Sequence, residues 1–200
     1  MNVDMSITAD RMIAEFLKAE LHSSRFRAGS LKALSMLEYR EELIENPNYD
    51  DEEQNVRRAK VLKLCRGWPD EGLFTNFPTG LKWHIGTIDQ NELSQSYRLK
   101  SSGNMTDGER LLSETVKRLK KGGVVNNINP ALINQIILEI EAQKLLPPII
   151  LVGENFKGKK VLVEGHSRSI AYVYVDKSQL PEYIPVIIGL STKISEWQYF

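Results

Sequence analysis

The sequence has little cysteine, no excess charge of either sign and no long apolar run, and each absence argues against a class of protein. Cys65 is the single cysteine among 200 residues, so the chain cannot form an internal disulfide and has no cysteine cluster for a metal. Lysine plus arginine and aspartate plus glutamate number 26 each. No net field therefore attracts nucleic acid or an anionic membrane.

Signals for a membrane or for export are also missing. No apolar segment approaches the roughly 20 residues that a membrane-spanning helix requires. The first residues, MNVDMSITADRM, lack the basic and then apolar regions of a secretion signal. We therefore expect a cytoplasmic protein with no membrane partner, and a nucleic-acid partner would need a local basic patch.

Apolar residues make up 42% of the chain, which is enough to bury a sizeable core. Residues 1–67 are predicted to form helices, because apolar side chains recur every three or four positions in the first of them. These positions are Met12, Ile13, Phe16, Leu17 and Leu21. A second helix is expected from a cap at Ser30 to the residue before Pro47. A third is expected from a capping box at Asp50 to Gly67.

The composition changes after this helical portion. Residues 68–80 are rich in glycine, proline and aromatic side chains, which predicts an irregular connection. Beyond it, residues 81–200 mix strand-like and helix-like segments without strict alternation. Strands are expected at 81–88, 148–153, 160–165 and 184–190, and helices at 106–123, 129–146 and 166–176. The predicted fold is therefore α+β, with an N-terminal helical portion followed by a small mixed sheet.

The segment GENFKGKK, residues 153–160, imitates a phosphate-binding P-loop. It has the required glycine and lysine spacing as far as Lys159, but Lys160 stands where a Ser or Thr would bind magnesium. The segment also joins two strand-like runs, whereas a P-loop opens a helix. We therefore predict a hairpin loop here.

The polar sequence Glu164-Gly165-His166-Ser167-Arg168 interrupts an apolar stretch directly after a predicted strand. Gly165 permits a tight turn, and the next residues can begin a helix whose first amides are unpaired. Such a terminus favours an anion, and the Arg168 guanidinium can grip phosphate or carboxylate through two hydrogen bonds. Ser167 adds a hydroxyl, His166 can transfer a proton near neutral pH, and Glu164 can act as a base or metal ligand.

Local chemistry leaves a structural explanation of the same residues open. In that interpretation Glu164 pairs with Arg168, and His166 caps a buried turn. A cation at a helix N-terminus opposes the helix dipole, so Arg168 needs an anion or a carboxylate beside it in either case.

The segment VLVEGHSRSIAYVYV, preceded by LLPPIILVG, resembles the ParB/sulfiredoxin-like superfamily. Its five polar residues match, position for position, the Asp-Gly-His-Thr-Arg form found in ParB-like kinases, with Glu for Asp and Ser for Thr. The similarity covers residues 81–190, where WHIGTIDQNEL resembles the first strand of the superfamily and TDGERLLSETVKRLKKGG its first helix. The whole arrangement is similar to that of a bacterial branch of ParB-like proteins.

This resemblance implies a protein that binds a nucleoside triphosphate, ATP or CTP, with Mg²⁺ as the accompanying ion. The residues that would hold the phosphates are Gly165, His166, Ser167 and Arg168. Phosphoryl transfer or nucleotide hydrolysis is the implied reaction class, with Glu164 and His166 as catalytic residues. The resemblance assigns no ligands to the metal and no acceptor substrate.

A second acidic residue stands near the start of the first helix in the kinases of the superfamily. Glu109, or Asp107, is the nearest equivalent here, and the resemblance implies that it is catalytic. Thr106 and Glu109 also have the spacing of a capping box, so a structural role competes with catalysis at Glu109.

Other branches of the superfamily match less well. Sulfiredoxin needs a cysteine in the motif, where His166 and Ser167 stand, and chromosome-partition proteins carry an arginine-rich motif there. Two alternatives stay open: a non-catalytic interaction protein, and a nuclease or DNA-associated module with a basic face. That face would be formed by residues 117–121 together with Lys157, Lys159 and Lys160.

Overall fold

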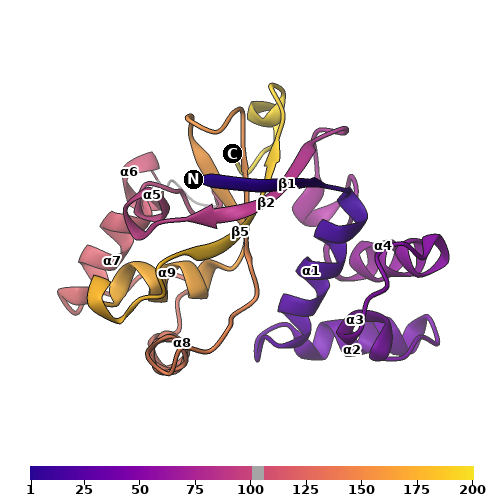
Figure 1. The fold of residues 1–200 in the computed structure, drawn as a ribbon, viewed down its shortest axis with the longest axis horizontal. Helices are drawn as coiled ribbons and strands as arrows, with labels where there is room; N and C mark the ends of the chain where they lie inside the picture. Colours follow the sequence, from indigo (N-terminus) through magenta and orange to yellow (C-terminus); the bar gives the residue numbers. More distant parts are fainter. Residues whose placement is uncertain (101–105) are drawn as a thin grey trace.

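The computed structural model describes residues 1–100 and 106–200, which form a mixed sheet flanked by helices (Figure 1). The strands are β1 (Asn2–Ile7), β2 (Lys82–Ile88), β3 (Ile149–Gly153), β4 (Lys160–Glu164) and β5 (Ile184–Leu190). The helices before β2 are α1 (Ala9–Leu21), α2 (Arg27–Met36), α3 (Glu42–Glu45) and α4 (Glu52–Arg66). Those after β2 are α5 (Gln90–Ser94), α6 (Asp107–Arg110), α7 (Leu112–Lys120), α8 (Pro130–Glu141) and α9 (His166–Tyr174). The predicted α+β class is confirmed.

The five strands lie in the order β1-β2-β5-β3-β4. β5 is antiparallel to β2 and parallel to β3, whereas β1 and β4 pair antiparallel with their neighbours at the two edges. Every residue of β3 is buried, which explains its uninterrupted apolar sequence IILVG. The motif segment therefore begins on an edge strand, β4, that is anchored to the most buried part of the sheet.

Helices cover both faces of the sheet, with one hydrophobic core on each (Figure 1). The core on the side of α1, α2 and α4 includes Phe16, Leu62, Val163, Ile187 and Trp197. The core on the side of α5, α7, α8 and α9 includes Leu93, Val116, Ile136, Leu151 and Ile170. Because strand side chains alternate between faces, a single strand contributes to both cores.

β1 is a strand that the sequence did not predict. Its residues are mostly exposed, so NVDMSI shows no apolar alternation that would identify it. It forms because its backbone pairs with β2, from Asn2 opposite Thr87 to Ile7 opposite Trp83. The helical prediction for residues 1–67 is therefore wrong over Asn2–Ile7, which extend the sheet.

Two of the helix boundaries predicted in residues 1–67 are also wrong. Ser30 is not a cap: it is buried inside α2, where its hydroxyl donates to the Phe26 carbonyl at 3.4 Å. The cap of α4 is Asp51 rather than Asp50, because its carboxylate accepts from the Gln54 amide at 3.0 Å. The predicted end of this helix at Gly67 is confirmed, with the left-handed conformation typical of such a position.

Predictions based on caps did better in the second half of the chain. The Thr106–Glu109 capping box is present, and Asn129 caps α8 with Pro130 as its first residue. The single helix predicted over 106–123 is interrupted at Leu111, whose extended backbone separates α6 from α7. The helix predicted over 129–146 ends earlier, at Glu141.

The segments predicted as connections pack as expected. The aromatic residues of 68–80 form a cluster in which Trp68 meets Phe74 at 4.9 Å and Phe77 meets Trp197 at 5.2 Å between ring centroids. The hairpin predicted between β3 and β4 is confirmed. The Asn155 side chain accepts from two backbone amides of this loop, at 2.8 and 2.9 Å, and no helix follows it.

Candidate functional site

The predicted strand–glycine–helix turn is present where β4 meets α9. Gly165 lies between them with φ of 92°, a conformation that residues with a side chain rarely adopt. A Cβ atom here would meet the Arg168 Nη2 at 3.2 Å and the Ile149 Cα at 3.3 Å. The Ser169 amide and hydroxyl both bond to the Gly165 carbonyl, at 2.8 and 2.9 Å. These contacts fix the first turn of α9, whose initial amides have no partner within the helix.

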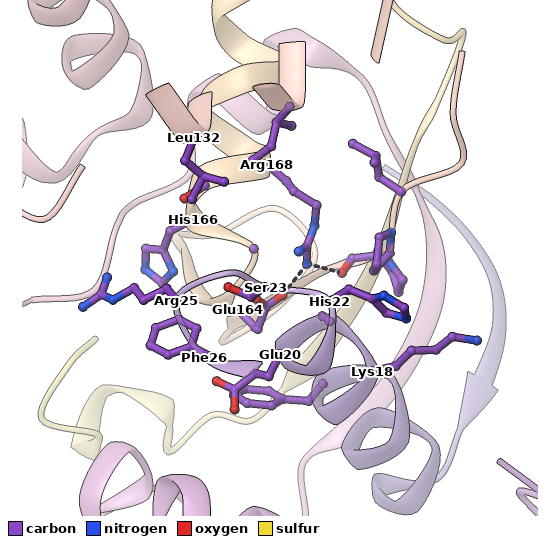
Figure 2. A pocket seen from close by; sticks show the side chains of 18 of the residues that line it. Lys18, Glu20, His22, Ser23, Arg25, Phe26, Leu132, Glu164, His166 and Arg168 are labelled. Atoms are coloured by element: carbon purple, nitrogen blue, oxygen red, sulfur yellow. Dashed lines mark hydrogen bonds and ion pairs between the residues drawn. The ribbon is translucent and has the colours of Figure 1, made fainter. Parts of the chain in front are cut away.

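Arg168 and Glu164 form an ion pair inside this turn (Figure 2). Both side chains are close to buried, with exposed fractions of 11% and 10%. Arg168 Nη2 also donates to the Pro148 carbonyl at 3.3 Å, while its buried Nε has no partner among the described residues. The pairing part of the structural interpretation is therefore confirmed: the carboxylate offsets the unfavourable position of a cation at a helix N-terminus.

The turn nevertheless opens into a cleft of about 920 Å³. One side of the cleft consists of the end of α1 and the loop that follows it, and the other of α8 and residues 144–148. Gly165, His166, Ser167 and Arg168 all line it, together with Glu164. The structure thus brings the predicted phosphate-binding residues together at the surface of a cavity large enough for a ligand.

A second ion pair lies in the same cleft, between Glu20 of α1 and Arg66 of α4. The Glu20 side chain is only 2% exposed. Burial raises the pKa of its carboxyl group, Arg66 opposes that effect, and the negative charge of Glu164 adds to it. The cleft therefore contains two carboxylate–arginine ion pairs, and the charge of Glu164 in one contributes to the raised pKa of Glu20 in the other.

His166 is partly buried at the start of α9. Its Nε2 atom lies 3.5 Å from the Leu99 amide, which can donate to it. Burial of the ring is the main cause that lowers the pKa of His166 to about 3, and four cations contribute to the same effect. In order of strength they are Arg98, Arg25, Arg168 and Arg66. His166 is therefore a neutral imidazole in this arrangement.

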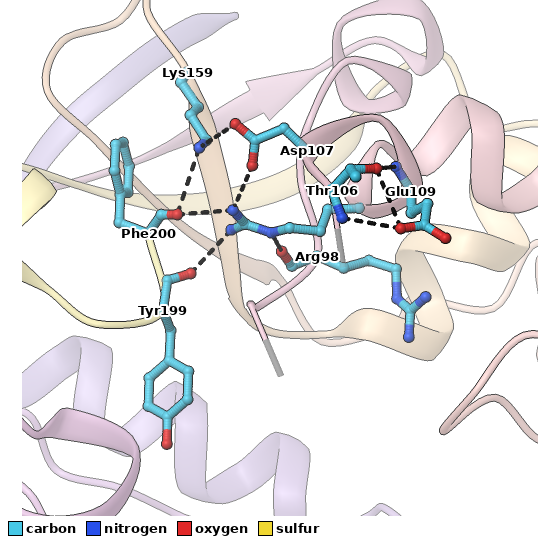
Figure 3. Close-up of polar contacts among 8 residues, drawn as sticks. Arg98, Thr106, Asp107, Glu109, Lys159, Tyr199 and Phe200 are labelled. Carbon is cyan, nitrogen blue, oxygen red and sulfur yellow. Dashed lines mark hydrogen bonds and ion pairs between the residues drawn. The ribbon is translucent and has the colours of Figure 1, made fainter. Parts of the chain in front are cut away.

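Arg98 lies beside this histidine in the segment that follows α5. Its side chain is 7% exposed, and burial lowers the pKa of its guanidinium. Nη2 donates to the Asn126 carbonyl at 2.9 Å, but the buried Nε and Nη1 have no partner in the described part of the chain. Its backbone is held by two hydrogen bonds with Arg110, each 2.9 Å long. Figure 3 shows the Arg98 guanidinium extending away from these polar contacts.

Glu109 is not brought to this cleft. It is exposed on the first turn of α6, where its carboxylate accepts from the Thr106 amide at 2.9 Å (Figure 3). That backbone hydrogen bond lowers the pKa of Glu109. Asp107 likewise pairs with Arg110 at 2.8 Å and with Lys159 at 3.2 Å. The capping role of Glu109 is confirmed, and no contact joins it to Glu164 or Arg168.

Sequence reasoning missed several charged residues of the cleft: Glu20, Arg25, Arg66 and Arg98. They belong to three segments far from the motif, so no spacing within the sequence links them. Glu20 alone carried a signal, because it lies four residues after Phe16 and thus on the apolar face of α1. A charge at such a position is rare unless it is paired.

The fold and the cleft define a class: an α+β protein with an arginine-lined cavity at a strand–glycine–helix turn. Within residues 1–100 and 106–200, no cluster of three or more His, Cys, Asp or Glu side chains could hold a metal ion. Over the same ranges, every helix is too short or too polar to span a membrane. Comparisons with protein-family models, curated proteins and solved structures gave no match for this chain.

Proposed function

We propose that this protein binds a nucleoside triphosphate, ATP or CTP, in the cleft, with phosphate held at the first turn of α9. The observation that carries the proposal is that four guanidinium groups line the same cleft as His166 and the first turn of α9, whose initial amides have no partner within the helix. Guanidinium groups and helix N-termini are the groups that most often bind phosphate in proteins.

The composition of the cleft supports a phosphorylated ligand of this size. Six basic side chains line it against four acidic ones, and its volume of about 920 Å³ lies in the range of small-molecule sites. One wall is apolar and can contact a nucleobase. It consists of Leu132, Ile136, Leu145, Leu146 and Pro147.

Phosphoryl transfer or nucleotide hydrolysis is the reaction class that we propose for this site. Glu164 is the carboxylate next to the first turn of α9, and it would accept the proton of the attacking hydroxyl or water. Mg²⁺ would accompany the nucleotide, since its phosphates and water molecules can supply most of the coordination shell. The bound ion would neutralise charge on the phosphates.

The proposed compartment is the cytoplasm, in which a single unpaired cysteine is usual. The nucleic-acid alternative gains no support from the lysines that would form its basic face. Lys159 is already bonded to Asp107 at 3.2 Å and to the Phe200 carbonyl at 3.4 Å. Part of the expected basic face is therefore neutralised within the protein.

A thermal-shift series with ATP, CTP and GTP, each with and without Mg²⁺, tests the proposal. Wild-type protein should be stabilised by ATP or CTP in a concentration-dependent manner. Arg168→Ala should weaken binding about tenfold or more, as expected for the loss of a charge-assisted hydrogen bond. Because Arg168 also holds Glu164, each variant's shift is measured from its own ligand-free melting temperature.

Lys117→Ala is the matched control, because Lys117 is an exposed cation on α7 outside the cleft. It should respond to nucleotide as the wild type does. A wild type that ignores every nucleotide but binds DNA in a salt-sensitive manner would contradict the proposal and favour the nucleic-acid alternative.

A further inference from the structure

The guanidinium group of Arg98 donates fewer hydrogen bonds to the described residues than those of the buried Arg58 and Arg110 do. Arg110 is 1% exposed, and all three of its nitrogen atoms donate hydrogen bonds. Arg58 is fully buried, and its two terminal nitrogen atoms donate four hydrogen bonds. Among the described residues, the Arg98 guanidinium donates one hydrogen bond, to the Asn126 carbonyl. A buried cation with unused donors costs free energy, so its unpaired side is suited to an anion.

Arg25 supplies a second guanidinium group to the same cleft, beside His166. It lies in the loop between α1 and α2, is exposed, and forms no ion pair among the described residues. Its guanidinium rests on the Phe26 ring, 4.8 Å from the centroid, which limits its motion. Figure 2 shows Arg25 next to the His166 ring. Arg98 and Arg25 also exert the two strongest of the charge effects on that ring.

We propose that Arg98 and Arg25 form an anion subsite over His166 that binds a phosphate group of the nucleotide. This inference rests on the proposed function and adds to it that the N-terminal helical portion supplies a ligand-binding residue. Arg98 contributes a buried, fixed donor group, and Arg25 contributes an exposed one from the opposite wall. Two guanidinium groups provide the forked donors that match phosphate oxygens.

His166 is suited to the floor of this subsite. Because its Nε2 can accept from the Leu99 amide, the ring proton is assigned to Nδ1, which makes the neutral ring a donor there. Because the neutral ring carries no charge, Arg98 and Arg25 supply the positive charge of this subsite. The N-terminal helices thereby become one wall of a composite site rather than an appendage to the sheet.

Binding of ATP and of inorganic tripolyphosphate, measured by isothermal titration calorimetry at one ionic strength, tests the subsite. The first variant is Arg25→Ala, which should leave the fold intact because Arg25 is exposed. The second is Arg98→Lys, which keeps the positive charge but removes the planar guanidinium group and its paired donors. Each should bind both ligands about tenfold or more weakly than the wild type. Arg40→Ala is the control and should bind normally, because Arg40 is an exposed arginine of the same helical portion outside the cleft.

The outcomes separate the subsite from the proposed function. If wild type binds ATP and both cleft variants bind it equally well, the subsite is wrong while the proposed function stands. If the variants lose affinity for ATP but not for tripolyphosphate, the two arginines contact the nucleoside and the phosphate subsite is again wrong. If wild type binds neither ligand, the subsite is wrong, and the proposed function fails with it if CTP does not bind either.

A spectroscopic readout distinguishes contact from a merely structural role. The charged groups around the His166 ring are Arg25, Arg66, Arg98 and Arg168. An anion placed between two of them favours the imidazolium form, so ATP should raise the pKa of His166 in an NMR titration of the ring. The rise should be smaller in Arg25→Ala. An unchanged titration in the presence of saturating ATP would contradict the subsite.

Discussion

At the scale of single residues, His166 is the clearest source of a pH effect. Its pKa is about 3 in the folded protein because of burial and four neighbouring cations, whereas an unfolded chain has the ordinary value of 6.5. The unfolded state therefore binds a proton first as the pH falls. The stability that His166 contributes is complete above pH 6.5 and is lost progressively between pH 6.5 and pH 3.

We predict that the stability difference between wild type and His166→Gln shrinks as the pH falls from 7 to 5. The slope should not exceed about 1.4 kcal/mol per pH unit, the value for one proton. Urea unfolding of both proteins at several pH values measures it. A difference that stays constant over this range would mean that His166 titrates normally in the folded state.

Glu20 should show the opposite pH dependence. Burial raises the pKa of this carboxyl group above 4.5, so the folded state retains the proton longer than the unfolded state. Stability therefore declines as the pH rises above 4.5. We predict that Glu20→Gln, which imitates the protonated acid, stabilises the protein at pH 7 and leaves it almost unchanged at pH 4.

Melting temperatures at the two pH values test this prediction, with Glu41→Gln as the control for an exposed ion pair. If Glu20→Gln were less stable than wild type at pH 7, the ion pair with Arg66 would outweigh the cost of burial. A carboxylate that lowers stability at neutral pH is typical of a functional site. The predicted result would therefore support the assignment of Glu20 to the cleft.

At the scale of elements, the junction of β4 and α9 depends on one glycine. Gly165→Ala forces a side chain into the left-handed region and brings its Cβ to 3.3 Å from the Ile149 Cα. We predict a loss of about 2 kcal/mol of unfolding free energy. Gly29→Ala should instead stabilise the protein by about 0.5 kcal/mol, because Gly29 lies inside α2 with open space around it. Urea unfolding measures the free energy of unfolding of both variants. Equal changes in the two would show that the left-handed backbone and close contacts at Gly165 do not determine its stability.

This junction could be predicted from the sequence because its determinants are local. A strand, a glycine and a polar helix start occur in consecutive residues, as do Asn129 and Pro130 at the start of α8. β1 could not be predicted, because its outward-facing side chains carry no pattern and only backbone pairing with β2 defines it. The pairing of Arg25 with Arg98 could not be predicted for a similar reason: the tertiary fold brings them together across 72 intervening positions that include several elements.

At the scale of the whole molecule, the cleft lies where helices of both faces approach one another. Its walls include α1, which packs in the first core, and α8, which packs in the second. The sheet between them fixes the distance across the cavity. The geometry of the site is therefore a property of the complete fold, including the N-terminal helical portion, and not of residues 81–200 alone.

The division of the chain at residues 68–80 is a prediction that unfolding experiments can test. Side chains from both sides of this connection share the first core: Phe16 and Leu62 precede it, and Val163, Ile187 and Trp197 follow it. β1 also joins the sheet from the N-terminal side. A shared core makes separate unfolding unfavourable, because either part alone would expose apolar surface.

We therefore predict one cooperative unfolding transition for the whole chain. Trp68, Trp83 and Trp197 all belong to the first core, so their fluorescence reports on it, whereas far-ultraviolet circular dichroism reports on every helix. The two signals should change together in urea. A fragment of residues 68–200 should show no cooperative transition, since it lacks β1 and the helices that cover Val163 and Ile187. Non-coincident transitions, or a fragment that folds, would establish two independent domains and a cleft formed by their docking.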